Sequence, residues 1–123
     1  MKEARKLSLS NKACLNFGCG SNILDGFTNI DGGDGEYFSA PSLPSVVRLD
    51  VFKALQCIQD NTSNIVTSEH FFEHFSRQDG HLLLREWFRV LKPCSILRIV
   101  IPDLEREENY ILDRTLIVTG IMI

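Results

Sequence analysis

The chain has 123 residues, of which 44% are hydrophobic and 24% are charged, a composition typical of one soluble globular domain. Its formal net charge of −3 and its pI near 5.5 disfavour a protein that binds nucleic acid over its whole surface. The apolar end of the chain is shorter than the roughly 20 residues that span a bilayer, and the basic N-terminus lacks the apolar stretch of a secretory signal. We therefore expect a cytoplasmic protein without a membrane segment.

The four cysteines, Cys14, Cys19, Cys57 and Cys94, form no CxxC pair and show no repeated spacing. Two or three of them stand among apolar residues. They are therefore expected to be buried free thiols in a reducing compartment.

Short apolar segments separated by turns predict a β-sheet. Strands are expected over residues 13–17, 27–31, 45–50, 63–67 and 95–101. A short helix is expected over 52–58. A longer amphipathic helix should follow a capping box at Ser76 and Asp79 and end before Pro93. Strands that alternate with helices predict parallel β-α-β units in an open, doubly wound α/β sheet.

The last part of the chain fits this pattern poorly. Residues 104–109 could form a charged helical turn, and 110–123 end in the apolar string LIVTGIMI, which has no obvious partner. A fifth strand without a neighbour would expose an apolar edge. We expect either this tail or a second copy of the chain, in a homodimer, to cover that edge.

A glycine-rich turn, Gly18-Cys19-Gly20, follows the first predicted strand. Ligands of doubly wound sheets bind at the carboxyl ends of the strands, and glycines allow close approach of the backbone. Asp31, at the end of the second strand, is placed to accept hydrogen bonds from ribose hydroxyls. Asp50, after the third strand, could contact adenine or simply cap the next helix.

The turn is not a dinucleotide fingerprint, because Ile23 stands where the third glycine should be. The connection to the second strand is also too short for a long helix after the turn. A nucleoside without a pyrophosphate therefore fits this site better than a dinucleotide.

Six blocks of the sequence match one known pattern, in the same order and spacing. They are residues 15–20 (LNFGCG), 26–31 (GFTNID), 48–51, 68–74, 84–93 and 97–103. Together they resemble the S-adenosylmethionine-dependent methyltransferases of the Rossmann-like class, in particular a compact group with the pattern LNLGCG…GWxNxD. The resemblance covers roughly residues 13–105 of a single domain, 1–123, with 106–123 as an atypical tail. It implies a Rossmann-like, mainly parallel sheet with flanking helices that is incomplete at its C-terminal side.

The resemblance implies S-adenosylmethionine as cofactor and S-adenosylhomocysteine as product. In such proteins the glycine turn wraps the methionine moiety, Asp31 holds the ribose, Asp50 and Val51 frame the adenine, and residues 68–70 lie beside the methyl group. The expected cofactor-binding residues are Asn16, Phe17, Gly18, Cys19, Gly20, Asp31, Gly32, Asp50, Val51, Ser68 and Glu69.

Two departures from the family pattern stand out within the matching blocks. Asn16 replaces an acidic residue that is common in wider relatives. Pro93-Cys94-Ser95 replaces a Pro-Gly-Gly turn, which could strain the entry to the fifth strand. Cys19 is interpreted as a small space-filling residue rather than a nucleophile.

The string EHFFEH contains His70-x-x-Glu73-His74, the spacing of a zinc-peptidase helix. That reading fails because a third ligand is lacking: the remaining histidine, His81, belongs to the next predicted helix. A partial divalent-ion site of His70, Glu73 and His74 stays open, as does a purely structural role for Glu73 and His74. We take His70 as the candidate catalytic residue, a general base toward the acceptor, and assign no metal.

The sequence thus predicts an enzyme that transfers a methyl group from S-adenosylmethionine to an unidentified acceptor. The alternative from another class is a truncated, non-catalytic Rossmann-like domain that serves as an interaction or dimerisation module. No membrane partner is expected, and no strong signal for nucleic acid is present.

Overall fold

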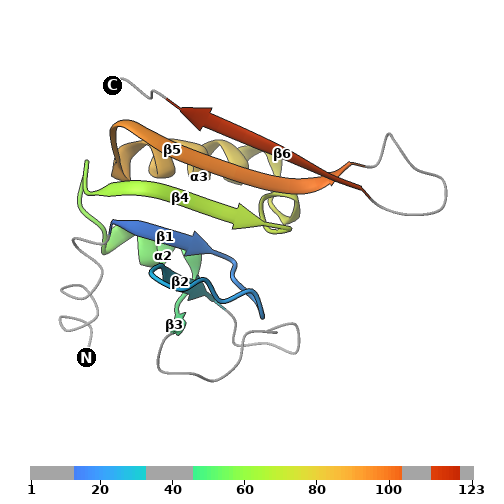
Figure 1. The fold of residues 1–123 in the computed structure, drawn as a ribbon, viewed down its shortest axis with the longest axis horizontal. Helices are drawn as coiled ribbons and strands as arrows, with labels where there is room; N and C mark the ends of the chain where they lie inside the picture. The colour runs from blue at the N-terminus through green and yellow to red at the C-terminus, as the bar shows by residue number, and fades with distance from the viewer. Residues whose placement is uncertain (1–12, 33–45, 104–111, 120–123) are drawn as a thin grey trace.

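The computed structural model describes residues 13–32, 46–103 and 112–119. This part of the chain forms a six-stranded sheet in the order β3-β2-β1-β4-β5-β6 (Figure 1). The strands are β1 (Cys14–Phe17), β2 (Thr28–Asp31), β3 (Val46–Arg48), β4 (Ser63–Glu69), β5 (Leu91–Asp103) and β6 (Leu112–Thr119). The helical elements are α2 (Val51–Gln56), the 3-10 helix η1 (Phe72–His74) and α3 (Arg77–Val90).

The sheet has the doubly wound topology expected from the sequence. Strands β3, β2, β1, β4 and β5 are parallel, and β6 pairs antiparallel with β5. From β1 the chain proceeds to β2 and β3 on one side of the sheet and to β4 and β5 on the other. The strand order therefore reverses between β1 and β4, which confirms the Rossmann-like α/β fold and locates its switch point.

The hydrophobic core lies between the sheet and the two helices α2 and α3, which cover the same face (Figure 1). Because side chains alternate along a strand, Leu15 and Phe17 point into this core while Asn16 points to the other face. Trp87 of α3 is fully buried, and its ring centroid lies 5.7 Å from that of Phe17. No helix in the described part of the chain is long and apolar enough to cross a membrane.

Helix α3 begins where the sequence predicts, because the Ser76 hydroxyl accepts a hydrogen bond of 3.1 Å from the Asp79 amide. As predicted, it ends before Pro93. It ends at Val90, and Leu91 already pairs with Ser63 of β4. Leu91 is fully buried in the core. Pro93 disfavours helical backbone at the residue before it, so the chain becomes extended before Pro93.

Strand β5 is consequently longer than predicted at both ends, and β6 covers its outer edge along residues 96–103. The expectation that the tail has no obvious partner is therefore corrected. The sequence predicts that either the tail or a second copy of the chain covers this edge. In the structure, residues 112–119 of the tail pair with it. The helical turn expected over 104–109 lies outside the described residues.

Two local predictions about backbone and cysteines can also be compared with the structure. Cys94 has a φ of +61°, so the turn that replaces Pro-Gly-Gly does place a non-glycine residue in the left-handed region. All four cysteines are free thiols, but only Cys19 is buried, and Cys94 is exposed. The expectation of two or three buried thiols was wrong in number.

Candidate functional site

The glycine turn, the end of β2 and the end of β4 meet at the carboxyl edge of the sheet. Phe17, the last residue of β1, stands beside Ile30 of β2 and Ser68 of β4 in the strand register. The residues that follow these three positions therefore converge where the strand order reverses. This is the place at which open α/β sheets bind their ligands.

The glycine turn is folded back onto β2. The amides of Gly18 and Cys19 both donate to the Ile30 carbonyl, at 2.8 and 3.2 Å. Gly18 and Gly20 have φ values of +64° and +52°, which glycine adopts without steric cost. A Cβ atom on Gly18 would also overlap the side chain of Phe71. The backbone conformation and the close contact both require glycine at position 18.

Asp31 fixes the end of this turn. One carboxylate oxygen, Oδ2, accepts a hydrogen bond of 2.6 Å from the Gly20 amide. The other oxygen accepts no hydrogen bond from any residue that the structure describes, and the side chain is partly exposed. Because an ionised carboxylate can accept about four hydrogen bonds, Asp31 retains the capacity to bind the paired hydroxyls of a ribose.

Cys19, the middle residue of the turn, is 4% exposed. Burial and the nearby negative charge of Asp31 raise the pKa of its thiol to about 11. At neutral pH the thiol is therefore protonated and a poor nucleophile. It packs with Val46 and Ile23, as a space-filling residue would.

Asn16 and Phe17 do not offer their side chains to a ligand at this edge. Phe17 is fully buried in the core beside Trp87. The Asn16 amide nitrogen donates to Asn29 Oδ1 at 2.9 Å and to the Asn22 carbonyl at 3.0 Å. Asn16 therefore holds the loop after the glycine turn in place, so a contact with cofactor at either position would have to come from the backbone.

The residues expected around an adenine serve mainly to connect β3 and α2. Asp50 Oδ2 accepts hydrogen bonds from the amides of Phe52 and Lys53, at 3.1 and 3.3 Å, so its capping role is observed. Val51 is buried. Gly32 lies so close to the backbone of Asp50 that any side chain at this position would overlap it.

Ser68 and Glu69 occupy different environments at the end of β4. Ser68 is fully buried, and its hydroxyl has no hydrogen-bond partner among the described residues. Glu69 Oε1 accepts a hydrogen bond of 2.7 Å from Arg98, while Oε2 accepts one of 3.2 Å from Asn22. Both oxygens of Glu69 are thus held by the protein itself.

His70 directly follows β4 in a strained conformation. Its φ is +53°, which costs a non-glycine residue about 1–3 kcal/mol, and its amide donates to the Val100 carbonyl at 2.9 Å. The His70 side chain is 48% exposed, with Nδ1 at 4.0 Å from Glu73 Oε2. Such strain is concentrated at functional sites, which supports His70 as a candidate but does not assign its role.

The EHFFEH string spans the end of β4, His70 and the 3-10 helix η1. Within the described ranges, no three His, Cys, Asp or Glu side chains gather to hold a metal ion. Glu73 and His74 lie in η1, a 3-10 helix of three residues, rather than in the long helix of a zinc peptidase. The partial site of His70, Glu73 and His74 is therefore not assembled.

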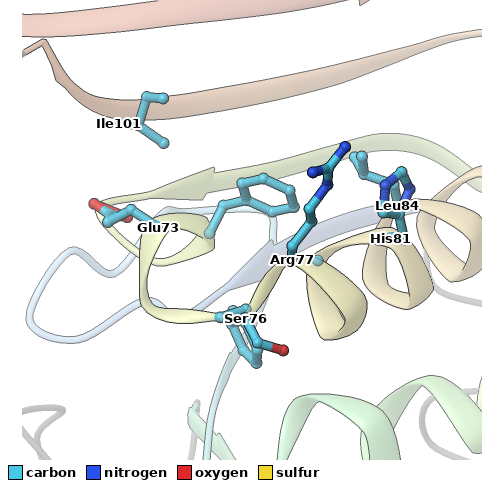
Figure 2. A pocket seen from close by; sticks show the side chains of 9 residues that line it. Glu73, Ser76, Arg77, His81, Leu84 and Ile101 are labelled. Carbon is cyan, nitrogen blue, oxygen red and sulfur yellow. The ribbon is translucent and has the colours of Figure 1, made fainter.

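A separate groove of about 360 Å³ lies beside η1 and the start of α3 (Figure 2). Its walls are mainly apolar, and the Arg77 side chain extends into the space between α3 and Ile101 of β5. The lining residues are Phe72, Glu73, Phe75, Ser76, Arg77, Gly80, His81, Leu84 and Ile101. None of the residues expected to bind the cofactor belongs to this groove.

A family model described as a methyltransferase domain matches residues 34–99, more than half of the 123 residues. The chain therefore belongs to this methyltransferase family. The match begins after Asp31, so it does not itself include the glycine turn. A search among curated proteins finds no match.

Several solved structures with a similar fold are methyltransferases. A SAM-dependent methyltransferase from Archaeoglobus fulgidus is similar with a TM-score of 0.61 at 23% identity, over 85% of this chain and 54% of that one. An arsenic(III) S-adenosylmethionine methyltransferase from Chlamydomonas reinhardtii has a TM-score of 0.52 at 13% identity, over 80% and 41%. At these identities the likeness establishes the fold, and the chain spans about half the length of these proteins or less.

A phosphoethanolamine N-methyltransferase of Haemonchus contortus, solved in complex with S-adenosyl-L-methionine, has a TM-score of 0.51 at 15% identity. The match covers 80% of this chain and 28% of that one. The acceptors named for these proteins differ, so the shared fold does not itself indicate an acceptor.

Proposed function

We propose that this domain binds S-adenosylmethionine at the glycine turn and Asp31, and that it transfers the methyl group to a nucleophilic acceptor. The cofactor would supply an electrophilic methyl group on a sulfonium sulfur. The acceptor atom would form a bond to the methyl carbon and give up a proton, while the bond from that carbon to sulfur breaks and S-adenosylhomocysteine is released. Membership of the methyltransferase family and the Rossmann-like fold support this class of reaction.

The observation that carries the proposal is the arrangement of Asp31 and the glycine turn at the switch point of the sheet. Asp31 accepts the Gly20 amide with Oδ2, and its other oxygen accepts no hydrogen bond from a described residue. A diol that binds this second oxygen would lie directly against the backbone of the turn. Ribose fits this chemistry, and the turn leaves no helix amides positioned for a pyrophosphate, because residues 18–27 form no helix.

We assign the individual cofactor contacts to the residues of the glycine turn and to those near Asp31. Gly18, Cys19 and Gly20 would contact the methionine moiety through their backbone, and Asp31 the ribose. Asp50 would approach the adenine only with the carboxylate that already caps α2. Glu69 would act through the loop that it holds rather than by direct contact.

His70 is proposed as the group that faces the acceptor. It lies at the carboxyl end of β4 with its side chain partly exposed and with Glu73 beside Nδ1. In this position the ring could orient an acceptor or accept its proton. Methyl transfer to a good nucleophile depends largely on positioning, so the first of these roles suffices for catalysis.

Isothermal titration calorimetry with S-adenosylhomocysteine tests the cofactor site without knowledge of the acceptor. We expect wild-type protein to bind, and Asp31→Asn to bind about tenfold or more weakly, since a charged hydrogen bond contributes about 1.5–3 kcal/mol. Asp79→Asn, an exposed change on α3, should leave the affinity unchanged. A folded wild-type protein that shows no binding would refute the proposal.

A further inference from the structure

Three polar side chains connect strand β5 to the loop that follows the glycine turn. Arg98 Nη1 of β5 donates to Thr67 Oγ1 at 3.1 Å and to Glu69 Oε1 at 2.7 Å. The second oxygen of Glu69 accepts a hydrogen bond of 3.2 Å from Asn22. Glu69 thus joins Arg98 of β5 to Asn22 of the loop, which lies 47 positions before Glu69 in the chain.

The connection lies on the face of the sheet opposite α2 and α3. Asn29, Asn16, Thr67 and Arg98 stand side by side in the register of four adjacent strands. Their sequence neighbours Leu15, Val66 and Leu97 point into the core on the helix side, so these four side chains point away from the helices.

The loop over residues 21–27 is held on this face by side chains, since no helix follows the glycine turn. Asn16 and Asn29 hold its backbone from within the sheet: Asn16 donates to the Asn22 carbonyl, and Asn29 Oδ1 accepts the Leu24 amide at 3.0 Å. The Asn22 side chain adds a hydrogen bond from the loop itself to Glu69 of β4. The loop is continuous with Gly20, whose amide is bound by Asp31.

We infer that Arg98, Glu69 and Asn22 form a positioning relay that sets the geometry of the glycine turn and hence the affinity for the cofactor. Arg98 is a positioning residue in this scheme: it fixes the Glu69 carboxylate, which in turn fixes Asn22 and the loop. The inference rests on the proposed function for its effect on ligand binding, but its effect on the loop does not depend on any ligand.

The relay explains why a charged pair is placed at this edge. The Arg98 and Glu69 side chains are 37% and 32% exposed, so their attraction is partly screened and adds little to global stability. The hydrogen bonds nevertheless restrict the rotamers of both groups. A bound Glu69 presents its second oxygen in one direction, and this gives Asn22 a fixed acceptor.

Calorimetric titration with S-adenosylhomocysteine tests the relay in four proteins: wild type, Arg98→Ala, Asn22→Ala and the double variant. Each single change should weaken binding about 2- to 10-fold, the range of one lost hydrogen bond. Because both changes break the same relay, the double variant should bind no more weakly than whichever single variant has the lower affinity. Arg85→Ala is the matched control, since Arg85 is exposed on α3 and makes no hydrogen bond or ion pair with a described residue.

Amide hydrogen exchange of the ligand-free proteins gives a second readout. Exchange at the Gly20 and Leu24 amides should accelerate in Arg98→Ala and in Asn22→Ala, while the core amides of α3 keep their wild-type rates in both variants. In the control Arg85→Ala, all these amides should exchange at wild-type rates. A merely structural role of Arg98 would instead accelerate exchange throughout the sheet. Asn22 is exposed, so Asn22→Ala reports on the loop even if Arg98→Ala folds poorly.

Two results would overturn the relay. One is wild-type exchange at Gly20 and Leu24 in Arg98→Ala and Asn22→Ala; the other is a double variant whose loss of affinity is the product of the single losses. If wild-type protein binds no S-adenosylhomocysteine, the proposed function fails, and the exchange experiment alone decides whether the relay exists.

Discussion

At the scale of single residues, the candidate site depends on contacts between the glycine turn and the groups around it. Asp31 binds the Gly20 amide, and Phe71 packs where a side chain of residue 18 would stand. The sequence predicts Asp31 and the glycines because their positions after two strands have a direct structural meaning. It does not predict that Glu69 is held by Arg98, 29 positions away, because that pairing depends on the strand register.

Gly18 and Gly26 provide a matched pair for the contact with Phe71. Both have positive φ, +64° and +79°, but a Cβ on Gly26 would meet nothing within 4 Å. Gly26→Ala should therefore lower the free energy of unfolding by about 1–2 kcal/mol through backbone strain alone. Gly18→Ala should cost about 3 kcal/mol or more, because overlap with Phe71 adds to that strain. Urea unfolding measures both, and equal losses would contradict the role assigned to Phe71.

At the scale of elements, Arg89 joins the two helices that cover the sheet. Its guanidinium donates to the carbonyls of Leu55 and Ile58, at 2.7 and 2.8 Å, and to Asp60 at 2.7 Å. Burial opposes its charge, but hydrogen bonds to Glu86 and Asp60 outweigh this and raise the pKa of Arg89 above its usual value. Arg89 thus supplies charged donors to carbonyls at and just after the end of α2, of which that of Leu55 also accepts the Ile58 amide at 3.1 Å.

We predict that Arg89→Ala lowers the free energy of unfolding by about 2–4 kcal/mol, because it leaves these carbonyls and Glu86 without their charged donor. Arg85→Ala, on the exposed side of the same helix, should change it by less than about 0.5 kcal/mol. Thermal or urea unfolding of both variants checks this. A similar loss in the two variants would show that Arg89 contributes only helix propensity.

The existence of most elements follows from sequence periodicity, but some of their ends do not. The predicted strands at 13–17 and 27–31 and the start of α3 agree closely with the structure. Strand β5 differs, since its first residues are extended by burial of Leu91 and its last ones by pairing with β6. Both causes are tertiary contacts, and local pattern carries no information about them.

At the scale of the whole molecule, the reversal of strand order at β1 and β4 brings segments far apart in sequence to one edge. The glycine turn, Asp31 and His70 come from the ends of three strands and converge only because β1 lies between β2 and β4. The chain spans 54% of the length of the Archaeoglobus fulgidus methyltransferase. The likeness in fold covers 85% of this chain.

Mapping of amide chemical shifts in ¹⁵N-labelled protein, before and after addition of S-adenosylhomocysteine, tests the central claim most directly. We predict the largest changes at Gly18, Cys19, Gly20, Asp31 and Gly32, with smaller ones at His70 and little change on the outer face of α3. Changes centred on the groove at Phe72 and Ile101, or no changes at saturating ligand, would contradict the proposed site.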